Sequence, residues 1–160
     1  ADLLKGHKSD DLLAGNGGAD QLNGGFGVDL LDGGLGDDIL FGGPDSDGMT
    51  GGDGMDLLTG GSGDDYFAYF AASESTNDEN RDEILDFEIG IDKIAFFMPA
   101  ASALTFVGGS DFTGTGPEIQ VRKTASGNSN VRVDIDGDGA ADMRILVEGV
   151  VGLSADDFLF

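Results

Sequence analysis

The chain contains no cysteine and no tryptophan, and its only histidine is His7. Without cysteine there is no disulfide scaffold, no iron–sulfur cluster and no cysteine nucleophile. A single histidine cannot supply a zinc site of the two- or three-histidine kind. The sequence also lacks a G-x-S-x-G nucleophile elbow and a phosphate-binding loop. These absences predict a chain that is not itself an enzyme.

Basic residues are scarce as well: 8 Lys and Arg stand against 31 Asp and Glu, which gives a net charge of −23. Such a polyanion repels nucleic acid and anionic lipid, so we expect neither as a partner. No apolar run approaches the ~20 residues of a membrane span. Hydrophobic residues make up 39% of the chain, too many for a typical disordered tail. The charge therefore has to be neutralised in a folded state, and cations are the obvious means.

Glycine is abundant, at 29 of 160 residues, and it belongs to an internal repeat. An aspartate recurs at every ninth position, a large apolar residue follows it by two, and a glycine precedes it by five. Seven such nonads fill residues 6–68 without insertion, and the clearest is G-G-L-G-D-D-I-L-F, Gly33 to Phe41. An acidic glycine-rich linker is the alternative, but a linker has no reason to keep an apolar residue at every ninth place.

Each nonad combines a turn with a short strand. The first part, G-G-x-G-x-D, forms the turn, and the remainder can span only ~10 Å as a strand with its central side chain turned inward. Two nonads then make one coil, so each residue is stacked on its counterpart two nonads later, and no coil buries its apolar residue alone. The aspartates form two columns, one of Asp11, Asp29, Asp47 and Asp65 and one of Asp20, Asp38 and Asp56. Columns of like charge repel unless a cation lies between their members.

The nonads resemble those of the RTX (haemolysin-type) calcium-binding family. This resemblance implies an all-β fold, a right-handed parallel β-roll in which a turn and the turn two nonads later bind Ca²⁺ together. The ligands would be aspartate carboxylates and carbonyls of the glycine-rich turns, which are the hard oxygen donors that calcium prefers. The implied ligand residues are Asp11, Gly15, Gly17, Asp20, Gly24, Gly27, Asp29, Gly33, Leu35, Gly36, Asp38, Gly42, Asp47, Gly51, Asp53, Gly54, Asp56, Gly60, Ser62, Gly63 and Asp65. We expect about four to six ions.

The turns are not equally well formed. Residues 6–11 read G-H-K-S-D-D, and residues 42–47 read G-G-P-D-S-D, where Asp45 replaces a glycine. The turns at 15–20, 33–38 and 51–56 keep the pattern, so we expect them to bind best. We interpret His7 as part of a degenerate repeat rather than as a metal ligand.

After Phe67 the nine-residue period ends. Residues 73–82 are polar and predict a surface loop, and residues 82–97 predict two strands joined near Gly90. Further strands are expected at 104–107, 118–123, 131–135 and 143–147. We therefore predict a β-roll at 1–69 and, at 70–160, an antiparallel β region that caps the open end of the roll.

An acidic run, Asp134, Asp136, Asp138 and Asp142, resembles the start of an EF-hand loop. The twelfth position of that loop is Ile145, where a bidentate glutamate is required. Strands rather than helices flank the run. A hairpin turn is the favoured interpretation, and one extra calcium site is the alternative.

The segment D-F-x-x-G-x-D-K-I, Asp86 to Ile94, resembles the segment after the roll in serralysin-type secreted metalloproteases, and the end of the chain is similar to theirs. This implies a non-catalytic C-terminal module of a larger extracellular protein whose upstream domain carries the zinc site. Asp157 to Phe160 would be the end of an uncleaved secretion signal, read by a type I exporter. Calcium would then induce folding after export and stabilise the attached domain.

An alternative function follows from another resemblance, to the RTX modules attached to alginate epimerases, which implies a polysaccharide- or surface-binding module. A polyuronate ligand needs a cationic strip, and only Arg122, Lys123, Arg132 and Arg144 could build one. The competing interpretation is that these are scattered, solvated charges.

Overall fold

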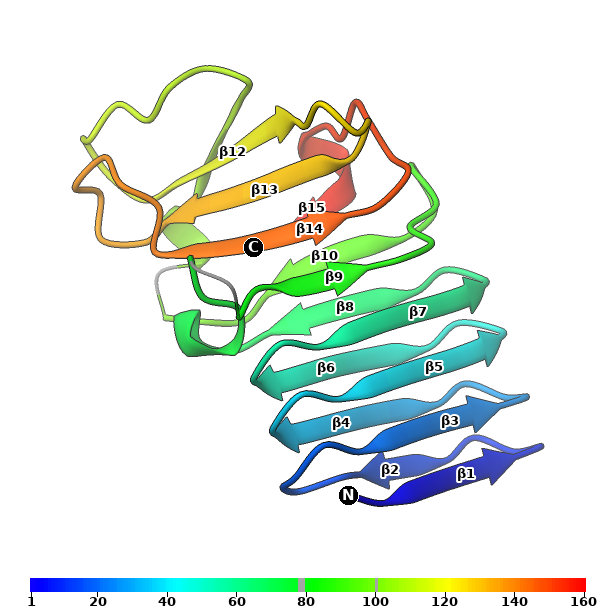
Figure 1. The fold of residues 1–160 in the computed structure, drawn as a ribbon. Helices are drawn as coiled ribbons and strands as arrows, with labels where there is room; N and C mark the ends of the chain where they lie inside the picture. The colour runs from blue at the N-terminus through cyan, green and yellow to red at the C-terminus, as the bar shows by residue number, and fades with distance from the viewer. Residues whose placement is uncertain (78–79, 100) are drawn as a thin grey trace.

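The computed structural model describes residues 1–77, 80–99 and 101–160, and strands dominate it (Figure 1). One sheet has nine strands, in the order β1 (Leu3–His7), β3 (Gln21–Gly25), β5 (Ile39–Pro44), β7 (Leu57–Ser62), β9 (Asp82–Ile84), β14 (Met143–Val147), β13 (Ser129–Asp134), β12 (Glu118–Lys123) and β11 (Thr105–Gly108). The other has six, in the order β15 (Phe158–Leu159), β10 (Lys93–Phe96), β8 (Tyr66–Tyr69), β6 (Gly48–Asp53), β4 (Leu30–Leu35) and β2 (Leu12–Ala14). Three single 3₁₀ turns complete the described elements: η1 (Ala72–Glu74), η2 (Ala101–Ala103) and η3 (Ala155–Asp157). None of the described helices is long and apolar enough to cross a membrane.

Successive nonads contribute strands to the two sheets in turn, which confirms the parallel β-roll. In the nine-stranded sheet Leu22 is paired with Leu40 and Leu40 with Leu58, in parallel register. In the six-stranded sheet Leu31 is paired with Met49 in the same way. Each partner lies two nonads further along the chain, so one coil takes two nonads, as the spacing predicts.

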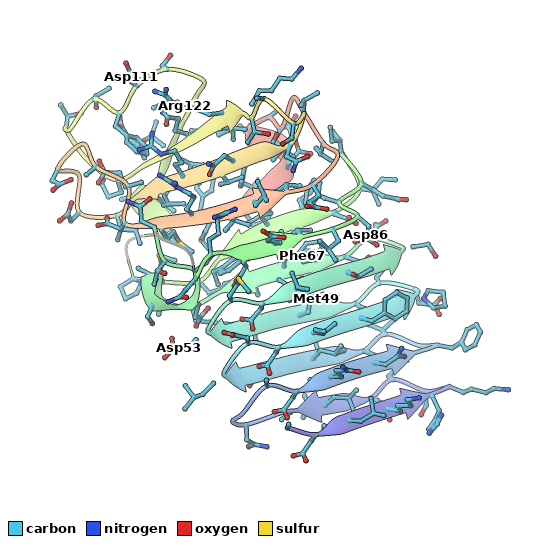
Figure 2. The ribbon with its side chains drawn as sticks, viewed as in Figure 1. Met49, Asp53, Phe67, Asp86, Asp111 and Arg122 are labelled. Atoms are coloured by element: carbon cyan, nitrogen blue, oxygen red, sulfur yellow. The ribbon has the colours of Figure 1, made fainter. Side chains whose placement is uncertain are left out.

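The repeated apolar residues form the core between the sheets. Leu22, Leu40, Leu58, Met49 and Phe67 are all buried, and Figure 2 shows Met49 and Phe67 within the stack. The residue before each of them points to the opposite face of its strand. Consistent with this, Ile39 and Tyr66, which precede Leu40 and Phe67, are exposed, and so are Leu3, Leu12 and Leu30, which precede the repeat positions Leu4, Leu13 and Leu31.

The second half of the chain continues both sheets of the roll. Strands β9 and β10 extend the parallel order, and their apolar residues Ile84 and Ile94 are fully buried. Strands β12, β13 and β14 then form an antiparallel meander, joined to the roll where β14 is paired in parallel with β9. Residue 69 ends β8, and the sheets run on past it, so one continuous core spans the roll and the meander.

The predicted strands in this half lie close to those observed. Strands β12 and β14 have the predicted bounds, while the bounds of β11 and β13 are slightly shifted from those predicted. The two strands predicted within 82–97 are β9 and β10. Of the predicted loop 73–82, residues 78–79 lie outside the described residues; Ser75 and Asp82 are buried rather than on the surface.

The alternation of buried and exposed positions gives a stability prediction. Leu40→Ala should lower the free energy of unfolding by about 2–5 kcal/mol, because it opens a cavity where the side chain has no exposed surface. Its neighbour Ile39 is 45% exposed, so Ile39→Ala should cost less than about 1 kcal/mol. Urea unfolding of both variants in calcium measures this difference. Equal losses would contradict the inward orientation of Leu40.

Candidate functional site

The repeated aspartates are buried and linked from coil to coil. The backbone N–H of Asp20 donates to Oδ1 of Asp38 at 2.7 Å, and that of Asp38 donates to Oδ1 of Asp56 at 2.8 Å. In the other column Asp29 and Asp47 are joined in the same way, at 2.8 Å. All of these carboxyl groups are at most 1% exposed. The turns therefore hold two columns of buried carboxylates, one at each edge of the roll.

The second oxygen of these carboxyl groups has no partner. Among the described residues, buried Oδ2 atoms without a hydrogen bond occur at Asp11, Asp20, Asp29, Asp38, Asp47, Asp56, Asp65 and Asp82. A buried carboxylate oxygen that is neither solvated nor paired is strongly unfavourable. The regular spacing of the unpaired atoms indicates one recurring requirement, which a bound cation would meet.

Backbone carbonyl oxygens lie close to the unpaired carboxylate oxygens. A Cβ placed on Gly33 would be 2.5 Å from Oδ2 of Asp38 and 2.5 Å from the carbonyl oxygen of Gly51. Similarly, a Cβ on Gly36, whose φ is +118°, would be 2.6 Å from the carbonyl oxygen of Gly18. Glycine is thus required at position 33 for the close approach of neighbouring oxygens, and at position 36 also for a left-handed backbone. The oxygens gathered at Gly33, one from a carboxylate and one from a carbonyl, are ligands of the kind that a hard cation such as Ca²⁺ prefers.

Two of the carbonyls expected as ligands already accept a hydrogen bond. The carbonyl of Leu35 accepts from the N–H of Gly18 at 2.7 Å, and that of Asp53 accepts from Gly36 at 2.8 Å. A carbonyl oxygen has a second lone pair, so these bonds leave room for a metal ligand.

Burial makes the carboxyl groups difficult to ionise. Desolvation is the largest cause that raises the pKa of Asp47 to about 6, of Asp56 to about 7 and of Asp65 to about 6. The pKa of Asp82 is raised to about 9, first by desolvation and then by the charge of Asp56. Backbone N–H donors oppose these shifts without cancelling them. A cation between the coils would favour the ionised form instead.

The degenerate turns are folded but strained. At nonad positions where other repeats have glycine, His7 has φ +91° and Asp45 has φ +84°. Side chains rarely adopt this conformation, and it costs energy in any residue with a Cβ. The sequence irregularities at 6–11 and 42–47 therefore coincide with backbone strain, which also occurs at Asn16, φ +67°, in the turn at 15–20.

Three further aspartates continue the columns beyond the nonads. The N–H of Asp56 donates to Oδ1 of Asp82 at 3.0 Å, and that of Asp65 donates to Oδ1 of Asp92 at 3.1 Å. Asp86 accepts from the N–H groups of Gly60 and Gly61, both at 2.9 Å (Figure 2). The nine-residue period missed all three.

A signal for two of them was present in the sequence. Asp82-Glu83-Ile84 and Asp92-Lys93-Ile94 each keep the last part of a nonad, an aspartate followed at the second position by a buried apolar residue. Only the glycine-rich turn is lost at both places.

The acidic run at Asp134 forms the loop of a β-hairpin between β13 and β14. Carboxylate oxygens of Asp134, Asp136 and Asp138 lie within 4.8 Å of one another. Both oxygens of Asp134 already accept loop N–H groups, from Gly137 at 2.7 Å and Gly139 at 2.8 Å. These bonds support the interpretation as a hairpin turn.

The predicted basic residues are partly gathered together. Arg122, Arg132 and Arg144 come from β12, β13 and β14, and the strand register places them on one face of the meander. Lys123 follows Arg122 directly and, by the alternation of side chains along a strand, takes the opposite face. Three of the four are therefore neighbours rather than scattered charges.

Comparison with known proteins gives the family context. The model of the peptidase M10 serralysin C-terminal family matches residues 17–160, and that of the RTX calcium-binding nonapeptide repeat (four copies) matches residues 1–31. No curated protein matches the chain.

Two solved structures from Azotobacter vinelandii are similar to the chain. The AlgE6R2 subunit of its mannuronan C5-epimerase is 26% identical, with 98% of this chain and 91% of that chain covered and a TM-score of 0.55. The AlgE6R3 subunit is 29% identical, with 97% and 80% covered and a TM-score of 0.49. The first similarity supports the β-roll fold.

The raised pKa values predict how stability depends on pH when no divalent cation is present. In the folded chain Asp47, Asp56 and Asp65 bind protons up to about pH 6–7, whereas the ordinary pKa of an aspartate is 3.8. Their protonated forms therefore stabilise the fold below about pH 4, and this stability is lost as the pH rises to about 7. Thermal unfolding in chelator at about pH 4.5, 5.5 and 6.5 should show a falling midpoint.

Asp56→Asn is the matched control for this pH dependence. The amide imitates the protonated acid and does not titrate, so the slope with pH should be smaller in this variant. A midpoint that rises with pH in chelator would contradict the burial of these carboxyl groups.

Proposed function

The chain belongs to the peptidase M10 serralysin C-terminal family and carries RTX calcium-binding repeats, and on this premise we propose that it is the calcium-dependent folding module of a larger secreted protein. The observation that carries the proposal is the series of buried, unpaired Oδ2 atoms along the two columns. The module would be non-catalytic and would act by folding and by stabilising the domain attached to it.

The residues that would hold calcium are the column aspartates and the carbonyls of the turns between them. Each ion would be shared by a turn and the turn two nonads later, through the ligand residues implied by the repeat. Asp82 continues one of the columns, since it accepts from the N–H of Asp56, but the buried hydroxyl of Tyr69 lies beside its carboxyl group and is a partner that the nonad aspartates lack. The positive charge of each ion would offset the repulsion within a column. We propose about four to six ions, of which those between well-formed turns bind best.

Binding and folding would be coupled. Without a cation, folding has to bury like charges and to order many glycines, and both are costly. A ligand that binds only the folded chain stabilises it by mass action, and several sites multiply the effect. Extracellular calcium modules work at ~10⁻⁴–10⁻³ M, so these sites would fill outside the cell.

Asp157 and Phe158, which we expect to belong to a secretion signal, are buried in the folded chain. Oδ1 of the buried Asp157 accepts from the N–H of Gly90 at 2.9 Å, and Phe158 stacks against Phe96 with ring centroids 6.4 Å apart. If the tail carries the signal for a type I exporter, these contacts would hide part of it. The exporter would therefore have to read the tail before the chain folds.

A second candidate is an accessory module that binds an acidic polysaccharide. Two observations favour it: the similarity in fold to a mannuronan C5-epimerase subunit, and the three arginines gathered on one face of the meander. The roll would then serve as the scaffold for the binding face.

Calcium titration followed by circular dichroism tests the folding proposal. At about pH 7.5 we expect little β-structure in chelator and a cooperative gain as calcium is added. Asp65→Asn should raise the calcium concentration for half-folding by about tenfold, equivalent to about 1.4 kcal/mol. It removes a buried carboxylate from a column.

The adjacent Asp64 supplies the control, because it is exposed and Asp64→Asn changes the net charge equally. This variant should leave the calcium midpoint close to that of the parent chain. A β-roll that is fully formed in chelator at this pH, with no spectral change on adding calcium, would overturn the proposal.

A further inference from the structure

Three of the four arginines of this chain share one face of the antiparallel meander, although the net charge is −23. Arg132 lies directly opposite Arg144 on the neighbouring strand, and opposite Gln120 on the other side. Arg122 lies on the same strand face as Gln120, at the second position after it in β12. Like charges opposite each other destabilise a sheet, so this arrangement carries a cost that packing alone does not explain.

Neutral groups orient the guanidinium groups. Oε1 of the buried Gln120 accepts from Nη1 of Arg132 at 2.6 Å and from Nε of Arg122 at 2.9 Å. The side-chain amide of Gln120 in turn donates to the carbonyl of Ser110. The ring of Phe112 lies under the guanidinium of Arg132, at 5.3 Å. These contacts fix the direction of the donors without neutralising any charge.

Several polar atoms on this face lack a partner. The Nε atoms of Arg132 and Arg144 and Oδ1 of Asn130 are buried and form no hydrogen bond in the part of the chain that the structure describes. Asn130 is paired with Arg122 across the sheet, so it belongs to the same face. Burial, and then the charges of Arg144 and Arg122, lower the pKa of Arg132. Burial keeps these atoms out of reach of a ligand, so the donors that the face presents to solvent are the outer guanidinium nitrogens of Arg122, which is exposed, and of Arg132 and Arg144, which are partly exposed.

One carboxylate already occupies part of this face. Arg122 forms a salt bridge with Asp111, whose side chain is 88% exposed on the loop before β12 (Figure 2). Neither Arg132 nor Arg144 has a carboxylate partner among the described residues. An exposed ion pair of this kind contributes little stability, so a carboxylate from outside could replace Asp111 at small cost.

We propose that Arg122, Arg132 and Arg144, the first two oriented by Gln120, form a binding site for the carboxylate of a sugar acid. Guanidinium groups bind a carboxylate by paired, charge-assisted hydrogen bonds. The sugar part of this ligand rests on the second candidate function, for which this site would be the contact surface. The same site would also bind a free sugar acid.

Isothermal titration in saturating calcium tests the site with three probes: D-galacturonate, trigalacturonate and the neutral sugar D-galactose. Galacturonate should bind and galactose should not. Arg132→Gln should weaken galacturonate about tenfold, because a hydrogen bond to a charged group is lost, and the double variant Arg132→Gln, Arg144→Gln should abolish binding. Asp111→Asn should strengthen binding severalfold, because it removes the competing carboxylate.

Lys5→Gln is the matched control, since it changes the net charge equally on the exposed surface of the distant strand β1. It should leave binding unchanged. If the arginine variants fail to fold in calcium, Asp111→Asn still tests the proposed binding site, because the exposed side chain of Asp111 is not needed for folding. No binding of galacturonate, equal binding of galactose, or no gain in Asp111→Asn would overturn the proposal.

The trimer separates this site from the polysaccharide function. Binding of galacturonate with no tighter binding of trigalacturonate would support the sugar-acid site and remove the second candidate function. Tighter binding of the trimer that is lost in the arginine double variant would support both. Trimer binding that persists unchanged in the double variant would overturn the site.

Discussion

Repulsion between buried carboxylates is the constraint on which the rest of this structure depends. The coils come close enough for each column aspartate to donate its backbone N–H to the carboxylate of the next, as Asp38 does to Asp56. This spacing uses Oδ1 and leaves Oδ2 buried without a partner. A side chain larger than hydrogen would fill the space between a column carboxylate and the next turn, as at Gly33. The glycine content and the acidic charge therefore both follow from the close stacking of the coils.

The roll could be predicted because its contacts repeat at a fixed separation. Once Leu22 is known to stack on Leu40, every later pairing follows with the same interval of two nonads. Beyond the nonads, the columns are continued by aspartates at other sequence separations. Asp82 and Asp92 are 26 and 27 residues from their partners Asp56 and Asp65, and a period cannot detect a ligand that a longer loop brings to the same place. A short local pattern, aspartate with an apolar residue at the second position after it, is the more general signal.

The arginine face could not be predicted in the same way. Arg122, Arg132 and Arg144 are neighbours only because two hairpins set the register of an antiparallel meander, and the sequence does not determine the lengths of those hairpin loops. The residue that orients two of the arginines, Gln120, has no sequence feature that distinguishes it from a surface glutamine. Its burial decides its role, and burial depends on the loop that carries Ser110.

The two charged regions of the molecule are joined through one short strand. In β9, Asp82 extends a carboxylate column of the roll, while its neighbour Glu83 is paired with Leu146 of β14, the strand that carries Arg144. Strand β9 is also paired with β7, the last nonad strand of this sheet. Strand β14 is hydrogen-bonded to β9, and Ser75 adds two hydrogen bonds to the backbone of Arg144, so the ordering of β9 contributes to the place of the meander in the sheet. Cations that order the columns would therefore also help to position the arginine face. Calcium binding at the columns and ligand binding at the arginines would then affect each other.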